Sequence, residues 1–147
     1  MKINTINFEK NFKVKFKNRS LLEQAFTHKS RNKNLNNEKL EFLGDRVIGL
    51  VLSKKLIDLY PNEKEGILDK RFAKLVNGKT CSSIAWDNKF QNFILLGDKQ
   101  KKITIKDEKI LSDSCEALIG AIYLEKDFKF LENFVLKLWK MKSPNQI

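Results

Sequence analysis

Apolar residues recur three and four positions apart along most of the chain, which is the period of amphipathic α-helices. Turn-forming residues such as Pro61, Asn77 and Gly78 separate the apolar segments. The pattern predicts helices at about 8–16, 21–27, 38–60, 67–76, 80–86, 109–125 and 128–139. Only residues 103–105 favour a brief extended piece, and they have no obvious strand to pair with. We therefore predict an all-α fold.

The N-terminal segments carry more specific local signals. Phe8, Phe12 and Phe16 recur every four residues, which predicts one helix with an aromatic stripe facing the core. Ser20 and Glu23 have the spacing of a capping box at the start of the second helix. The only histidine, His28, follows that helix. A histidine-based zinc site needs several histidine ligands, so a structural role is expected for His28.

Residues 38–60 form the longest predicted helix, which would extend about 35 Å at about 1.5 Å per residue. Apolar residues occupy most of its circumference, so we expect it to be central and covered on most sides. Gly44 and Gly49 lie inside it, and each weakens a helix by about 1 kcal/mol relative to alanine. Close approach of another backbone, or a self-complementary dimer contact, would explain that cost.

Two acidic pairs interrupt apolar helices. Glu41 and Asp45 are four residues apart, and Asp113 and Glu116 are three apart, so each pair lies on one helical face. Carboxylates from two facing helices would supply the hard oxygen ligands that Mg²⁺ or Mn²⁺ prefers. Such an ion can lower the pKa of a bound water molecule and stabilise charge on a phosphate. Ordinary solvated or salt-bridged helices have the same spacing, so spacing alone leaves both interpretations open.

Composition narrows the class of protein. The formal net charge of +11 suits a polyanionic partner such as nucleic acid, although most of the 29 basic residues are lysines spread over the whole chain. The sequence contains no run of about 18 apolar residues, the length needed to cross a membrane. The N-terminus also lacks the apolar core of a signal peptide. Cys81 and Cys115 lack metal-ligand spacing and are expected to be reduced, buried thiols. These features predict a cytoplasmic protein.

Three sequence blocks resemble the ribonuclease III family. Residues 37–50, NEKLEFLGDRVIGL, look like its signature, and residues 109–125, KILSDSCEALIGAIYLE, are similar to its second block. The segment 61–85 between them and the His28-Lys29-Ser30 element also resemble the family pattern. The resemblance covers about residues 20–140, in order and at family-like spacing.

The resemblance implies the ribonuclease III endonuclease-domain fold, a homodimer, and cleavage of double-stranded RNA with Mg²⁺, for which Mn²⁺ could substitute. Metal-activated water would attack the phosphodiester and leave 5′-phosphate and 3′-hydroxyl ends with short 3′ overhangs. The implied site residues are the metal ligands Glu41, Asp45, Asp113 and Glu116, of which Asp45 and Glu116 are catalytic, the auxiliary acids Glu38 and Glu65, and Phe42 at the dimer interface.

Departures from the family pattern leave alternatives open. Arg46 replaces the usual small residue after the signature aspartate, where it could pair with an acid or reach phosphate. We expect residues 1–140 to be the catalytic domain and 141–147 a tail that would lead to an absent double-stranded RNA-binding domain. Both an excised domain and a naturally minimal protein fit. A non-cleaving, ribonuclease-III-like RNA-binding protein is the main rival function, and an all-α nucleotide pyrophosphohydrolase fits the sequence blocks less well.

Overall fold

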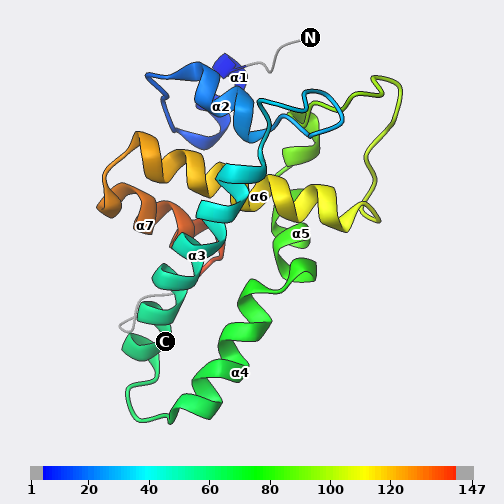
Figure 1. Ribbon diagram of the computed structural model, residues 1–147. Helices are drawn as coiled ribbons and strands as arrows, with labels where there is room; N and C mark the ends of the chain where they lie inside the picture. The colour runs from blue at the N-terminus through cyan, green and yellow to red at the C-terminus, as the bar shows by residue number, and fades with distance from the viewer. Residues whose placement is uncertain (1–4, 142–147) are drawn as a thin grey trace.

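The computed structural model describes residues 5–141, which form seven α-helices and one short 3₁₀-helix (Figure 1). The helices are α1 (Thr5–Phe12), α2 (Arg19–Ala25), α3 (Glu38–Leu59), α4 (Glu65–Val76), α5 (Gly78–Asp87), η1 (Phe90–Asn92), α6 (Glu108–Glu125) and α7 (Phe128–Leu138). Among the described residues the only β-pairing is an isolated bridge between Thr27 and Leu95. The prediction of an all-α fold is confirmed, and residues 103–105 do not form a strand. Most of the predicted tail at 141–147 lies outside the described residues.

Helices α3 and α6 cross at the centre of the molecule, and the other helices pack around them to complete the hydrophobic core (Figure 1). A Cβ atom built on Gly44 of α3 would lie 1.7 Å from the backbone oxygen of Glu116 in α6. On α6, a Cβ atom built on Gly120 would lie 2.2 Å from the backbone oxygen of Leu40. Both positions must therefore be glycine for the two backbones to touch. The expected close approach is confirmed for Gly44. A Cβ atom built on Gly49 would meet only the ring of Phe72, at an ordinary contact distance of 3.5 Å.

The predicted aromatic stripe exists, but one continuous helix does not carry it. Helix α1 ends at Phe12, and Lys13 adopts a left-handed backbone with φ of 55°. Phe16 therefore lies outside the helix, yet it is buried, and its ring centroid lies 6.5 Å from that of Phe8. The prediction of a helix through Phe16 was wrong because burial of the ring does not require helical backbone.

The predicted capping box is not formed. Helix α2 begins at Arg19, and its N-cap is Asn18, whose side chain accepts a hydrogen bond from the backbone N–H of Leu21 at 3.3 Å. Ser20 lies inside the helix and donates its hydroxyl to the same Asn18 side chain at 2.6 Å. An asparagine two residues earlier thus took the capping role predicted for Ser20, since both residue types are good N-caps.

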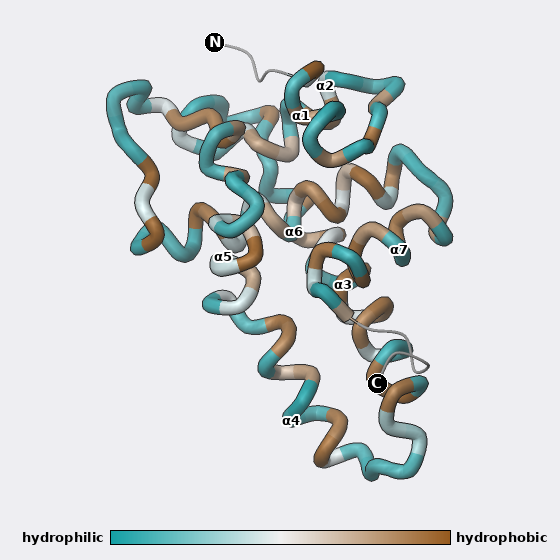
Figure 2. The backbone as a smooth tube through the Cα atoms, turned by 180° about the vertical axis from the view of Figure 1, so that it is seen from behind, coloured by the Kyte–Doolittle hydropathy of each residue, from teal (hydrophilic) through white to brown (hydrophobic). Residues whose placement is uncertain are grey.

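The C-terminal half of α3 and the whole of α4 project from the body as a two-helix arm (Figure 1). Hydrophobic positions line α4 in Figure 2, yet none of its residues is buried in this chain. On α3, Phe42, Leu50 and Ile57 are 62%, 59% and 58% exposed. This many uncovered apolar side chains along α3 and α4 indicate an interaction surface. None of the helices among residues 5–141 has the length and apolar character needed to cross a membrane.

Candidate active site

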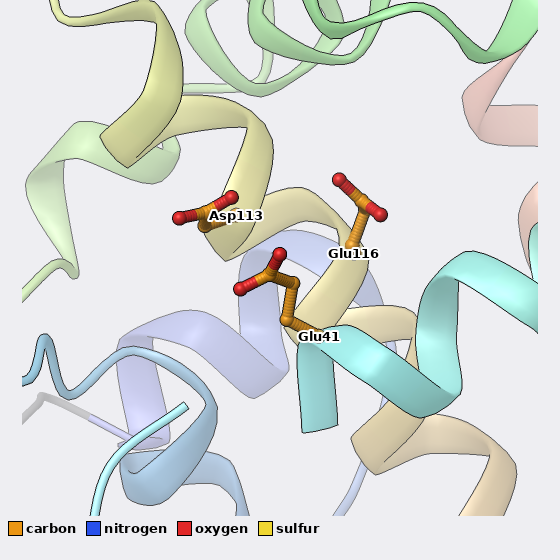
Figure 3. A group of neighbouring side chains, drawn as sticks. All are labelled: Glu41, Asp113 and Glu116. Carbon is orange, nitrogen blue, oxygen red and sulfur yellow. The ribbon is translucent and has the colours of Figure 1, made fainter. Parts of the chain in front are cut away.

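The crossing of α3 and α6 brings carboxylates from both helices together. Glu41 projects from α3, and Asp113 and Glu116 project from successive turns of α6 (Figure 3). One carboxylate oxygen from each of the three lies within 4.8 Å of the others. All three side chains are partly buried. Because Gly44 and Gly120 allow the helices to touch one turn away, the same contact that builds the core also builds this acidic cluster.

Asp45, the fourth predicted ligand, lies at the edge of this cluster. Its carboxylate is 3.4 Å from the Arg46 guanidinium, and its side chain is 55% exposed. The Arg46 guanidinium also stacks 3.9 Å from the centre of the Phe42 ring. Of the two roles expected for Arg46, pairing with an acid or reaching phosphate, the structure shows the first. Asp45 nevertheless remains near enough to Glu116 to raise the pKa of that carboxyl.

The cluster holds more negative charge than its own residues neutralise. Burial, followed by the nearby Asp45 and the other acids, raises the pKa of Glu116 to about 8. Burial and the facing Asp113 also raise the pKa of Glu41. Burial alone raises the pKa of a carboxyl, and the neighbouring acids add to the shift because their charges repel the ionised form. An all-oxygen donor set with excess negative charge fits a hard divalent cation and does not fit a soft metal.

The raised pKa of Glu116 makes the stability of the metal-free protein depend on pH. Between the ordinary value of 4.5 and about 8, the folded protein binds protons that the unfolded protein does not. The free energy of unfolding should therefore fall as pH rises through this window. We expect the urea midpoint, measured in EDTA, to decrease accordingly, and Glu116→Gln to remove most of that slope. An unchanged slope in the variant would show that other groups cause it.

A cavity of about 230 Å³ lies directly beside the acidic cluster. It is lined by His28, Lys29, Asn37, Glu38, Glu41, Lys109, Ile110 and Asp113. Glu38, the first residue of α3, thus lines the same cavity as Glu41 and Asp113, and its auxiliary role stays a prediction. His28 accepts the Ser30 backbone N–H at 3.1 Å, and burial lowers the pKa of its ring. A neutral, hydrogen-bonded imidazole agrees with the structural role expected for it.

Lys109 is a site residue that the sequence analysis missed. Its ammonium lies 3.1 Å from one oxygen of Asp113 and 3.4 Å from the other. The signal was present, because Lys109 precedes Asp113 by four residues and so shares its helical face. The sequence analysis counted this residue only as the start of the predicted helix 109–125.

Glu65 is the one predicted acid that the single chain does not bring to the cluster. It is the first residue of α4, at the far end of the arm, whereas Glu38 begins α3 at the opposite end (Figure 1). The intervening 22-residue helix spans about 33 Å at about 1.5 Å per residue. Glu65 and the acidic cluster could therefore meet only between two chains.

Comparison with known proteins places this fold and site in a family. A family model described as ribonuclease-III-like matches residues 18–142. Ribonuclease 3 of Pelagibacter ubique (strain HTCC1062) is 54% identical over 95% of this chain, and that of Campylobacter jejuni (serotype O:2) is 40% identical over 96%. The chain spans 63% of the length of each of these relatives, which is less than two thirds.

Solved structures give the same result. The nuclease domain of ribonuclease III from Campylobacter jejuni superposes with a TM-score of 0.87 at 40% identity, covering 93% of this chain and 96% of that one. Dicer from Pichia stipitis matches with a TM-score of 0.66 at 27% identity, covering 86% of this chain and 56% of that one. The chain therefore belongs to the ribonuclease III family, and its fold is that of the family's nuclease domain.

Proposed function

We propose that this chain is a divalent-metal-dependent endoribonuclease that cleaves double-stranded RNA. The observation that carries the proposal is the meeting of Glu41, Asp113 and Glu116 at the α3–α6 crossing of a ribonuclease III nuclease fold. The relatives named ribonuclease 3 support the reaction class. The net charge of +11 favours a phosphate-rich substrate.

The cluster would hold Mg²⁺, with Mn²⁺ as a substitute. Two ligands on opposite sides of Mg²⁺ are about 4 Å apart, so oxygens within 4.8 Å of one another need only small side-chain movements to reach that geometry. Glu41, Asp113 and Glu116 would be ligands, and Asp45 would join them by turning away from Arg46. The ion would lower the pKa of a water molecule and offset the charge of the scissile phosphate.

The protein's own residues would orient the two reactants. Glu116 and Asp45 lie beside one another on facing helices, which suits them to the catalytic positions nearest the phosphate. Glu38 faces the adjacent cavity and would accept a hydrogen bond from the attacking water or from a ribose hydroxyl. Hydrolysis that breaks the bond between phosphorus and the 3′ oxygen leaves a 5′-phosphate and a 3′-hydroxyl.

The exposed apolar face of α3, which begins at Phe42 and continues along the arm, would pair two subunits. Phe42, Leu50 and Ile57 are spaced eight and seven residues apart, so they follow one face of α3, and α4 adds uncovered apolar positions beside them. A structure of the Campylobacter nuclease domain concerns flexibility in the region involved in dimer formation of that protein. Two subunits would provide two active sites, one for each RNA strand, and the partner's arm would bring Glu65 toward the cluster. Staggered cuts would leave short 3′ overhangs.

Phe42→Asp should abolish dimer formation. A central aromatic contributes roughly 2 kcal/mol, and a two-fold interface contains it twice, so the dissociation constant should rise about a thousandfold. Sedimentation equilibrium would measure it. Leu124→Asp is the matched control, because Leu124 is 57% exposed on α6, away from the arm. A dimer that survives Phe42→Asp, or that Leu124→Asp disrupts equally, would contradict the proposed interface.

Substrate class and product ends test the proposed reaction. The protein would be incubated with Mg²⁺ and a long RNA duplex, the same duplex as DNA, or one RNA strand alone. We expect only the RNA duplex to be cut, into short duplexes with 5′-phosphates, 3′-hydroxyls and 3′ overhangs. Binding of duplex RNA without cleavage would favour the rival, a ribonuclease-III-like RNA-binding protein.

We also propose a cytoplasmic location. The bacterial relatives support it, as do the two free cysteines, Cys81 and Cys115, which are buried. Burial raises the pKa of the Cys81 thiol to about 12, so this cysteine stays a protonated, unreactive thiol.

A further inference from the structure

Lys109 already places a positive charge in the acidic cluster. Its ammonium contacts both oxygens of Asp113, and it is positioned beside Glu41 in the wall of the same cavity. The Asp113 side chain is only 16% exposed, whereas that of Lys109 is 81% exposed. Asp113 is therefore a fixed group, and Lys109 is a long, solvated side chain that reaches it from outside.

The helix itself does not favour a lysine at this position. Lys109 lies in the first turn of α6, where the positive end of the helix dipole disfavours a cation. A basic residue four positions before an acid is also the weaker orientation for a helical ion pair. The attraction must therefore come from the acids. In agreement, the hydrogen bond to Asp113 raises the pKa of Lys109, and the Lys109 charge acts to lower the pKa of Glu41.

We propose that Lys109 is an internal counter-ion that occupies the acidic cluster without metal and must withdraw from Asp113 when a divalent cation binds. This inference rests on the proposed metal site. The two oxygens that contact the ammonium are the ones that Asp113 would offer to the ion. Both cations compete for them, so Lys109 lowers the affinity for metal while stabilising the metal-free fold. Its flexible, exposed stem can withdraw without movement of the backbone.

Metal affinity, measured without RNA, tests this role. Isothermal titration calorimetry with Mn²⁺ would compare the full chain with Lys109→Met, which keeps a long side chain but removes the charge. An exposed ion pair is a weak competitor, so Lys109→Met should bind Mn²⁺ about threefold to fivefold more tightly. Lys109→Arg, which keeps the charge, should stay within about twofold of the parent protein.

Lys54→Met is the matched control. Lys54 forms the same kind of pair with Asp58, four residues away on α3, at 3.2 Å and with 64% exposure. Its removal lowers the net charge equally, but it should leave Mn²⁺ affinity unchanged. Unchanged or weaker binding by Lys109→Met, or an equal gain in Lys54→Met, would overturn the role of Lys109. Absence of Mn²⁺ binding by all of the proteins would instead reject the metal site itself, and the Lys109 proposal with it.

Discussion

Glu116→Gln should reduce cleavage of duplex RNA by at least about a hundredfold without unfolding the protein. A metal ion contributes several kcal/mol to charge stabilisation, and each 1.36 kcal/mol is worth about a factor of ten in rate. The substitution keeps the size of the side chain but removes the charge of a proposed ligand. It also removes a carboxyl group whose ionised form is disfavoured by burial and by Asp45. The melting temperature in EDTA should therefore be unchanged or higher.

The combination of lost activity and retained stability separates a functional residue from a structural one. Initial rates at saturating Mg²⁺ and melting curves in EDTA would be measured on the same preparations. Glu132→Gln, on α7 and remote from the acids, is the control and should leave both quantities unchanged. Parent-like cleavage by Glu116→Gln would remove Glu116 from the proposed catalytic group. A large drop in melting temperature would instead mean that Glu116 holds the fold together.

Gly44→Ala should be the most destabilising small substitution in the core. The added methyl group would lie 1.7 Å from the Glu116 backbone oxygen and 3.0 Å from the Gly120 backbone nitrogen. Neither atom can rotate away, so α3 and α6 must separate. Overpacking typically costs 1–3 kcal/mol and sometimes more, and against rigid backbone we expect a loss of about 3 kcal/mol or more. Separation of the helices would also spread the carboxylates and lower activity.

Gly66→Ala is the control for this effect. Gly66 lies in α4, where an added Cβ would meet nothing within 4 Å. The substitution should therefore raise the free energy of unfolding by about 0.5 kcal/mol through helix propensity alone. Urea denaturation of both variants would measure the contrast. A loss below about 1 kcal/mol for Gly44→Ala would mean that the helix crossing yields easily, contrary to its proposed role as a rigid support.

Much of the fold follows from local sequence signals. The apolar pattern between Glu38 and Pro61 predicted α3 to within one residue of its observed end at Leu59. Glycine inside that pattern pointed to a close backbone approach, which exists at Gly44 but not at Gly49. Sequence signals were less decisive for the ends of helices, where more than one residue or backbone conformation fits the pattern. Asn18 and Ser20 can both cap a helix, and Phe16 is buried with or without helical backbone.

The candidate site was less predictable, because its geometry depends on side-chain directions. Spacing and family resemblance indicated Glu41, Asp113 and Glu116, which the structure brings together. Spacing could not show that Asp45 turns toward Arg46, or that Lys109 reaches back to Asp113. Both contacts involve a long basic side chain, Arg46 or Lys109, that could form an ion pair with more than one nearby carboxylate. Glu65 begins α4 at the far end of the arm, so its proposed role near an acidic cluster requires a second chain, which no pattern within one sequence describes.

The dependence of duplex RNA cleavage on divalent metal tests the proposed metal-dependent function most directly. Long double-stranded RNA would be incubated with the chain at low salt, where phosphate contacts are strongest, first in EDTA and then with increasing Mg²⁺. The RNA should stay intact in EDTA and be cleaved in a saturable manner on addition of Mg²⁺. RNA that stays intact at every Mg²⁺ concentration, or that is cut equally well in EDTA, would contradict the proposed function.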